Sequence, residues 1–189
     1  CSRFLIEFNG GVNSKEQVAE LRNAVTINAE TSYLELHERM AQMQAMDFWA
    51  AFKFDRIGHD SISGQPQNLI EQINQMYSNL VVLNAADDLL DSYPGTSFEL
   101  QLGVSSGYDI QSTDGSIVAE CFAVTTVSSN SKLEKDCKKL ITSDATEKYI
   151  YFYSHQDSEE KLQKQFDKHP DITFKRVTFS KTLQTSTHS

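Results

Sequence analysis

One carboxylate interrupts the most apolar stretch of this chain. The stretch covers residues 116–126, and its centre is apolar on both sides of Glu120. A run of this kind predicts a strand that is covered on both faces of a sheet. Burial of a carboxylate is costly unless a cation, a metal ion or a hydrogen-bond donor compensates it. Glu120 therefore constrains the fold, because the folded chain has to bring a partner to it.

A hairpin turn sets a second acid beside Glu120. Asp114-Gly115 predicts the turn, since both residues tolerate the positive φ that hairpin turns demand. The strand before the turn opens at Tyr108-Asp109, so folding at the turn sets Asp109 across from position 120 or 121. Two carboxylates within ~5 Å repel each other unless one is protonated or a hard cation bridges them, and Mg²⁺ is the natural cation. The structural alternative is that Asp109 only ends its strand.

Periodicity and turn residues predict the other elements. Towards the N-terminus they indicate a strand at 4–8, a turn at 9–11 and a helical stretch at 15–54 with a break near 26–32. A loop at 55–67 and a second long helix at 68–92 follow. From residue 96 they indicate a short helix at 97–105 and the hairpin at 108–126. A helix at 132–141, a strand at 148–153, a helix at 157–168 and a strand at 172–179 follow. We therefore expect an α/β (α+β) protein with a mainly helical part at 1–95, an α/β core at 96–180 and a flexible tail at 181–189.

Three acids and their order give the chain a family resemblance. Glu99 stands in the predicted helix before the hairpin, Asp109 on the first hairpin strand, and Glu120-Cys121-Phe122 on the second. In this respect residues 96–179 resemble the PD-(D/E)XK superfamily of restriction-endonuclease-like nucleases, which carries a Glu on its first core helix, an Asp on a hairpin strand and a (D/E)-x-K triplet on the next strand. The helix, strand, helix and strand that follow also fit that family's order. The resemblance implies a restriction-endonuclease-like core, in which helices flank a mixed sheet.

The same resemblance implies Mg²⁺-dependent hydrolysis of phosphodiester bonds, with DNA as the expected substrate of an endonuclease. Asp109 and Glu120 would bind one or two Mg²⁺ ions, Glu99 would add a ligand or else face solvent, and Mn²⁺ is expected to substitute. Phe122 stands where the family has its lysine. Variants of the family take the basic group from the following helix, where Lys132 is the first candidate.

The helix after the hairpin is rich in lysine. Lys135, Lys138 and Asn130 are the residues suggested for nucleic-acid contact, and a solvated helix face is the structural alternative for the lysines. Residues 1–120 contain 6 Lys and Arg against 17 Asp and Glu, whereas residues 121–189 contain 11 against 9. A net charge of −9 disfavours general binding of nucleic acid, because phosphate neutralisation supplies most of that affinity, but the basic groups gather in the C-terminal part.

Composition agrees with a cytoplasmic protein that has no membrane contact. The chain is 39% hydrophobic, and no stretch approaches the ~20 consecutive apolar residues of a membrane span. The N-terminus lacks the basic and apolar pattern of a signal peptide. Cys121 and Cys137 are expected to be small buried side chains in a reducing compartment.

Two other interpretations stay open. One is a catalytically inactive module of the same fold that binds nucleic acid or a protein partner. The other is an unrelated α/β interaction protein in which the hairpin acids are structural. In a nuclease, the N-terminal helices would serve dimerisation or substrate selection, and a homodimer is one expected arrangement, since paired cuts in a duplex require two active sites.

Overall fold

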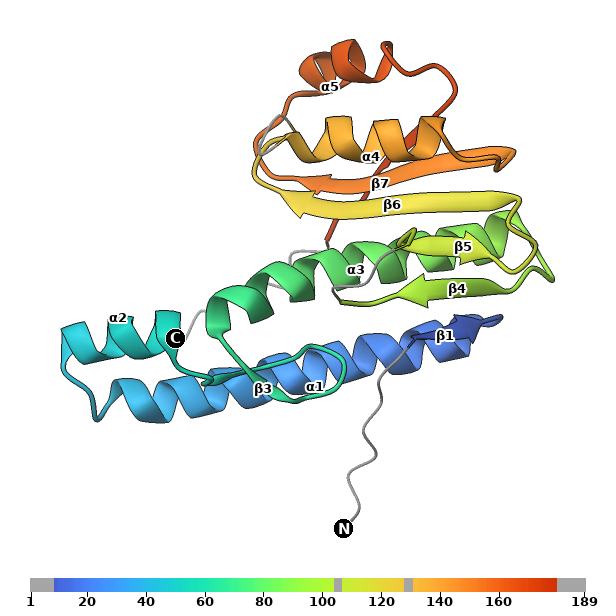
Figure 1. Cartoon of the computed structure of the whole chain (residues 1–189). Coiled ribbons are helices and arrows are strands. Elements are labelled where there is room, and N and C mark those ends of the chain that lie inside the picture. The colour runs from blue at the N-terminus through green and yellow to red at the C-terminus, as the bar shows by residue number, and fades with distance from the viewer. Residues whose placement is uncertain (1–8, 104–106, 128–130, 180–189) are drawn as a thin grey trace, which may run out of the picture.

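A six-stranded sheet between two layers of helices forms the protein (Figure 1). The computed structural model describes residues 9–103, 107–127 and 131–179. The strand expected at 4–8, the tail at 181–189 and Asn130 lie outside these residues. In chain order the elements are β1 (Asn9–Val12), α1 (Lys15–Met40), α2 (Ala45–Phe54), β2 (Gly58–His59), β3 (Pro66–Gln67), α3 (Leu69–Ser92), β4 (Phe98–Gln101), β5 (Ile110–Ser112), β6 (Ile117–Val124), α4 (Lys132–Ile141), β7 (Glu147–Ser154), α5 (Glu159–Phe166) and β8 (Thr173–Arg176).

The sheet is mixed. Its strands follow the order β1-β4-β5-β6-β7-β8, and β2 and β3 form a small separate hairpin. The strands from β1 to β6 in this order pair antiparallel, whereas β6, β7 and β8 pair parallel. Helices α4 and α5 supply the crossovers that parallel strands require. The expected α/β architecture is therefore confirmed, as are the helix, strand, helix and strand predicted after the hairpin.

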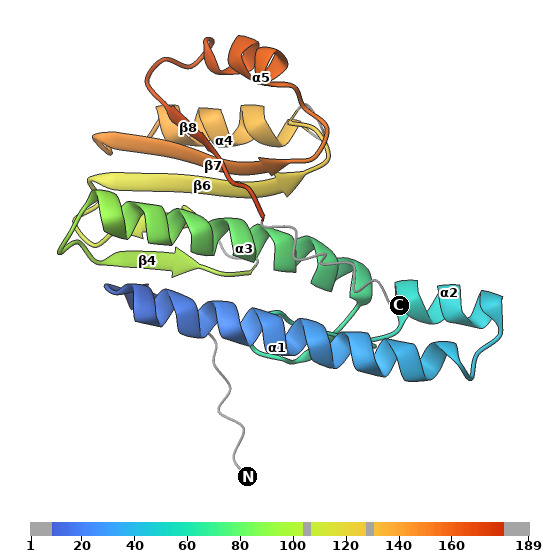
Figure 2. The same cartoon turned by 180° about the vertical axis from the view of Figure 1, so that it is seen from behind.

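Both faces of β6 are covered, as its apolar sequence predicts. On one face α1 and α3 pack against the sheet, where Leu83 and Leu89 of α3 are fully buried. On the other face α4 and α5 contribute Leu140 and Leu162. Figure 2 shows α3 running along the face opposite to α4. In the described part of the chain, no helix is both long enough and apolar enough to cross a membrane.

Two segments expected as a helix and a turn form paired strands instead. The helix predicted at 97–105 is wrong, because Phe98 and Leu100 of β4 point into the core and Glu99 points away from it. The turn predicted at 9–11 is also wrong, since this segment is β1 and pairs with β4. Pairing between segments that are distant in the sequence decided both outcomes, and local propensity does not report such pairing.

The N-terminal helices also differ from expectation in one place. Helix α1 runs through residues 26–32 without a break and ends at Met40, and α2 begins at Ala45. Hydroxyl groups in the segment 26–32 donate to carbonyl oxygens four residues earlier, which satisfies them within the helix. They belong to Thr26, Thr31 and Ser32. The helix expected at 68–92 is confirmed as α3.

The hairpin turn between β5 and β6 forms where Asp114-Gly115 predicts it. Gly115 has a φ of 74°, and its amide donates to the Ser112 carbonyl oxygen at 2.8 Å. Asp114 Oδ1 accepts from the Ser112 hydroxyl and from the amide and hydroxyl of Ser116, and these bonds lower the pKa of Asp114 to about 2. The turn therefore fixes the register between β5, which precedes it, and β6, which follows it.

Gly115→Ala is expected to lower the free energy of unfolding by about 1 kcal/mol, because an L side chain is strained at positive φ. The added Cβ would meet Gln111 Nε2 at 3.5 Å, an ordinary contact, so the loss would report backbone strain. Urea unfolding measures the loss. Gly115→Asn is the control, since Asn tolerates the left-handed region and should cost less. Equal losses for the two variants would contradict the strain explanation.

Candidate functional site

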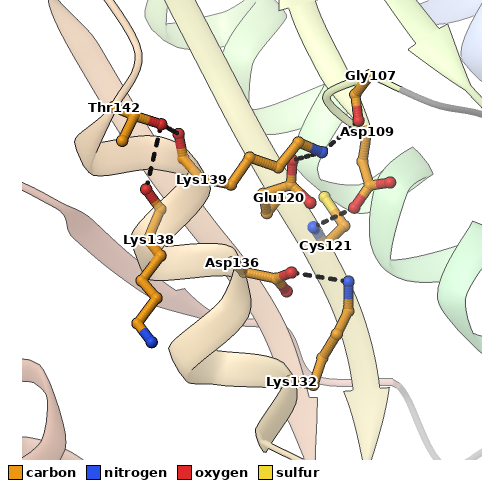
Figure 3. Close-up of polar contacts among 9 residues, drawn as sticks. All are labelled: Gly107, Asp109, Glu120, Cys121, Lys132, Asp136, Lys138, Lys139 and Thr142. Carbon is orange, nitrogen blue, oxygen red and sulfur yellow. Dashed lines mark hydrogen bonds and ion pairs between the residues drawn. The ribbon is translucent and has the colours of Figure 1, made fainter.

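Asp109 and Glu120 lie side by side on the sheet face that α4 covers. Ile110 pairs with Ala119, so the antiparallel register continues to Asp109 opposite Glu120. The Cys121 amide donates to Asp109 Oδ2 at 2.7 Å, which ties this acid to β6 (Figure 3). Glu120 is 2% exposed, whereas Asp109 is half-buried, so solvent reaches the pair from the Asp109 side.

Lys139 of α4 is the cation that reaches Glu120. Its Nζ lies 2.5 Å from Glu120 Oε1 and also donates to the Gly107 carbonyl oxygen. The same ammonium stands 5.0 Å from the centre of the Tyr108 ring, in a cation–π contact. Figure 3 shows the side chain reaching across from α4 to Glu120 and Gly107. The partner that a buried Glu120 requires is therefore a lysine from the helix that follows the hairpin.

A second ion pair lies beside the first on α4. Lys132 Nζ donates to Asp136 Oδ1 at 2.9 Å, and Asp136 is buried. Within the described ranges, the other carboxylate oxygen of Asp136 has no hydrogen-bond donor. The spacing of Lys132, Asp136 and Lys139 puts all three on one face of α4, which looks toward the sheet (Figure 3). With Asp109 and Glu120 added, the site holds three carboxylates and two ammonium groups.

Burial raises the affinity of the site's carboxylates for protons. Burial raises the pKa of Glu120 to about 7, the charge of Asp109 adds to the increase, and Lys139 offsets only part of it. Burial also raises the pKa of Asp109 and that of Asp136, against the opposing effects of the lysines of α4. A divalent cation between Asp109 and Glu120 would favour the ionised carboxylates and would compete with protons for them.

Glu120 is expected to make the folded protein less stable as the pH rises. Its pKa is about 7 in the folded protein against an ordinary value of 4.5, so this contribution to stability is complete below pH 4.5 and is lost as the pH rises through 7. The loss should be on the order of 2 kcal/mol in the free energy of unfolding. Urea unfolding without divalent cations, at about pH 5 and about pH 8, measures it.

Two variants separate Glu120 from the other titrating groups. Glu120→Gln removes its titration, so the stability of this variant should change less than that of the wild type between the two pH values. Glu160→Gln is the control, because Glu160 lies in an exposed ion pair with Lys164 on α5 and should leave the wild-type difference unchanged. If Glu120→Gln keeps the full wild-type difference, the titration belongs to other groups.

The other residues that the sequence suggests do not join the carboxylate pair. Glu99, expected on a helix, is exposed on β4. The residue of β4 beside Asp109 is Gln101, whose main-chain N–H donates to the Asp109 carbonyl oxygen at 2.9 Å. Lys135 and Lys138 are exposed on α4, and Lys138 points away from Glu120 (Figure 3). The structure thus brings Asp109 and Glu120 together and leaves Glu99 out.

The sequence makes Lys132 the first candidate for the basic group that replaces the family's lysine, whereas the lysine that forms an ion pair with Glu120 is Lys139. Lys132 pairs with Asp136, and Lys139 reaches Glu120. One signal in the sequence could have found Lys139. It follows Asp136 by three residues and Lys132 by seven, so it shares a helix face with both, whereas Lys138 lies on another side of the helix.

Phe122 explains why the basic group comes from a helix. Its side chain lies on the same face of β6 as Glu120, buried in the apolar core below α4, with its ring centre 6.0 Å from that of Phe152. A lysine at this position would bury its charge among apolar side chains, which is costly. Lys139 supplies a positive charge to Glu120 without that cost, because its own side chain is partly exposed.

The oxygen atoms of the pair suit a hard divalent cation. Mg²⁺ binds carboxylate oxygens, often only one or two from a protein, and keeps several water molecules. Asp109 and Glu120 supply such oxygens, and a bound cation would compete with Lys139 for Glu120. Across residues 9–103, 107–127 and 131–179, no three His, Cys, Asp or Glu side chains are grouped as metal ligands. The fit is therefore to an ion that takes two protein carboxylates.

Comparisons with other proteins give no relative for this site. No protein-family model, curated protein or solved structure matches the chain. The site is therefore described by its own geometry: Asp109, directly before β5, lies opposite Glu120 of β6, and a lysine from α4 pairs with Glu120.

Proposed function

We propose that this protein is a Mg²⁺-dependent nuclease of the PD-(D/E)XK kind, which hydrolyses phosphodiester bonds in DNA as an endonuclease. The observation that carries the proposal is the pair Asp109 and Glu120 with Lys139 beside it. Two carboxylates and a basic group that converge at one place on a sheet are the parts that metal-assisted hydrolysis uses.

The order of the elements supports the proposal. The family that the sequence resembles has a helix, a hairpin strand with an Asp, a strand with the (D/E)-x-K triplet, and then a helix and a strand. In this chain α3 precedes β4, Asp109 directly precedes β5, β6 contains Glu120, and α4 and β7 follow. The first core helix would then be α3 rather than a helix at 97–105.

Each charged group would have a task in this reaction. Asp109 and Glu120 would hold Mg²⁺, which when bound activates a water molecule and stabilises negative charge on the phosphate. Lys139 would take the place of the family's lysine, where it orients the attacking water and offsets negative charge on the phosphoryl oxygens. Lys135 and Lys138 would contact the phosphate backbone from the exposed side of α4.

One observation favours a second function, a catalytically inactive module of the same fold that binds nucleic acid or a protein partner. Glu120 is almost fully buried, and Lys139 already neutralises it. If Glu120 stays paired with Lys139 and binds no metal ion, the protein would not cut nucleic acid. The exposed lysines of α4 could still bind a partner.

Incubation with supercoiled plasmid tests the proposal. In Mg²⁺ the nuclease is expected to convert the plasmid to nicked and linear forms, Mn²⁺ should substitute, and EDTA should stop the reaction. A gel shift of the same DNA in EDTA, with no cleavage in Mg²⁺ or Mn²⁺, would favour the inactive module. Neither cleavage nor binding would overturn both functions.

A further inference from the structure

A helical arm of this protein exposes a large apolar surface. The arm consists of α2 and the C-terminal half of α1, and Figures 1 and 2 both show it extending beyond the end of the sheet. On α2, Met46, Trp49 and Phe54 are 77%, 60% and 72% exposed. On the C-terminal half of α1, three more large apolar side chains are over half exposed, namely Tyr33, Leu34 and Met40.

Helix α2 is apolar around its whole circumference. Its only charged residues are Asp47 and Lys53, and the other positions are Ala, Met, Phe or Trp. The described part of the chain buries only one side of α2, where Ala51 and Phe52 lie in a small apolar cluster with Leu36 of α1 and Leu69 at the start of α3. A helix that is apolar all round is normally buried on all sides, so the outer side of α2 is expected to be covered.

The exposed area matches one side of a protein interface. If each whole side chain has the ~150–250 Å² of an aromatic one, the six side chains leave on the order of 800 Å² in contact with water. The largest apolar patch of a typical monomer is about 300–600 Å², whereas a standard interface covers about 800 Å² on each partner. The summed apolar area of the arm is therefore comparable with one side of a standard interface.

We propose that the arm binds the arm of a second copy of this chain, with the two α2 helices antiparallel about a twofold axis, so that two helical hairpins form a four-helix bundle. Charge favours this occupant. Helix α2 has no net charge, so two copies meet there without repulsion although each chain carries −9. Asp47 stands in the first turn of α2 and Lys53 in the last. An antiparallel pair brings Asp47 of each copy towards Lys53 of the other and opposes the two helix dipoles.

Trp49 provides a direct test, because it is the only tryptophan of the chain. The wild type should sediment as a dimer at ~100 µM, and dilution should shift the tryptophan emission to longer wavelength as the mass falls to that of a monomer. The two changes should share one midpoint concentration. A monomer at every concentration, or a Trp49 emission that does not follow the mass, overturns the proposal.

Charge exchange on α2 tests the antiparallel arrangement. Asp47→Lys and Lys53→Asp should each raise the dissociation constant of the dimer at least about tenfold, and the double variant should return it to within about threefold of the wild type. Glu160→Lys is the matched control, since it makes the same charge change as Asp47→Lys at an exposed position of α5 and should leave the constant unchanged. A double variant as weak as the single variants overturns the arrangement, whatever the outcome for DNA cleavage.

Discussion

Glu120→Gln is expected to lower the rate of Mg²⁺-dependent DNA cleavage at least about 100-fold while the protein stays folded. The amide keeps the shape of the side chain on β6 and loses the anionic oxygen that lies 2.5 Å from Lys139 Nζ. Loss of a residue that only supports a metal ligand costs about 10–100-fold, so the loss of a ligand should cost at least the upper end of that range. The initial rate of plasmid nicking at saturating Mg²⁺ measures the effect.

The free energy of unfolding of Glu120→Gln shows whether the loss of activity comes from unfolding. The same substitution removes a buried carboxylate whose pKa burial raises to about 7, so at higher pH and without metal the variant should be at least as stable as the wild type. Glu160→Gln is the control for activity, because Glu160 is far more exposed and lies on α5. A Glu120→Gln variant that still cuts at a rate within about threefold of the wild type would remove Glu120 from the active site.

The central hairpin could be predicted from local sequence because its causes are local. Asp114-Gly115 specifies the turn through the positive φ at Gly115, and the apolar run after it specifies a strand with two buried faces. The cost of burying Glu120 is also a local argument, which required a cation, a metal ion or a hydrogen-bond donor nearby, and Lys139 lies there. Helix α4 likewise begins and ends where its amphipathic pattern predicts.

Glu99 and Lys139 could not be assigned in this way, because their places depend on distant parts of the chain. Glu99 lies on a strand only because β4 pairs with β1 on one side and β5 on the other. Lys139 faces Glu120 because Leu133, Cys137 and Leu140 pack against the sheet and set the rotation of α4. Sequence patterns identify an amphipathic helix. Which strand each of its lysines faces depends on how the crossover between β6 and β7 places the helix on the sheet.

Lys139→Met is expected to lower the cleavage rate about 100-fold, and Lys132→Met less than about tenfold. The two lysines form a matched pair, since both lie on one face of α4 and their side chains are 39% and 41% exposed. They differ in their partners, because Lys132 is held by Asp136 and Lys139 contacts Glu120. Initial rates of plasmid nicking compare the two variants, and equal losses would contradict a special role for Lys139.

A role for Lys139 in the reaction, rather than in folding alone, predicts two further results. Mn²⁺ should bind Lys139→Met at least as tightly as the wild type, because the ammonium that competes for Glu120 Oε1 is gone. The pH at which cleavage becomes half-maximal should move upward, because Lys139 lowers the pKa of Glu120 and its loss leaves burial and Asp109 to raise that pKa further. Titration of Mn²⁺ by its electron paramagnetic resonance signal and a pH–rate profile measure the two effects. A variant that loses metal affinity together with activity, with an unshifted profile, would make Lys139 a structural residue of the site.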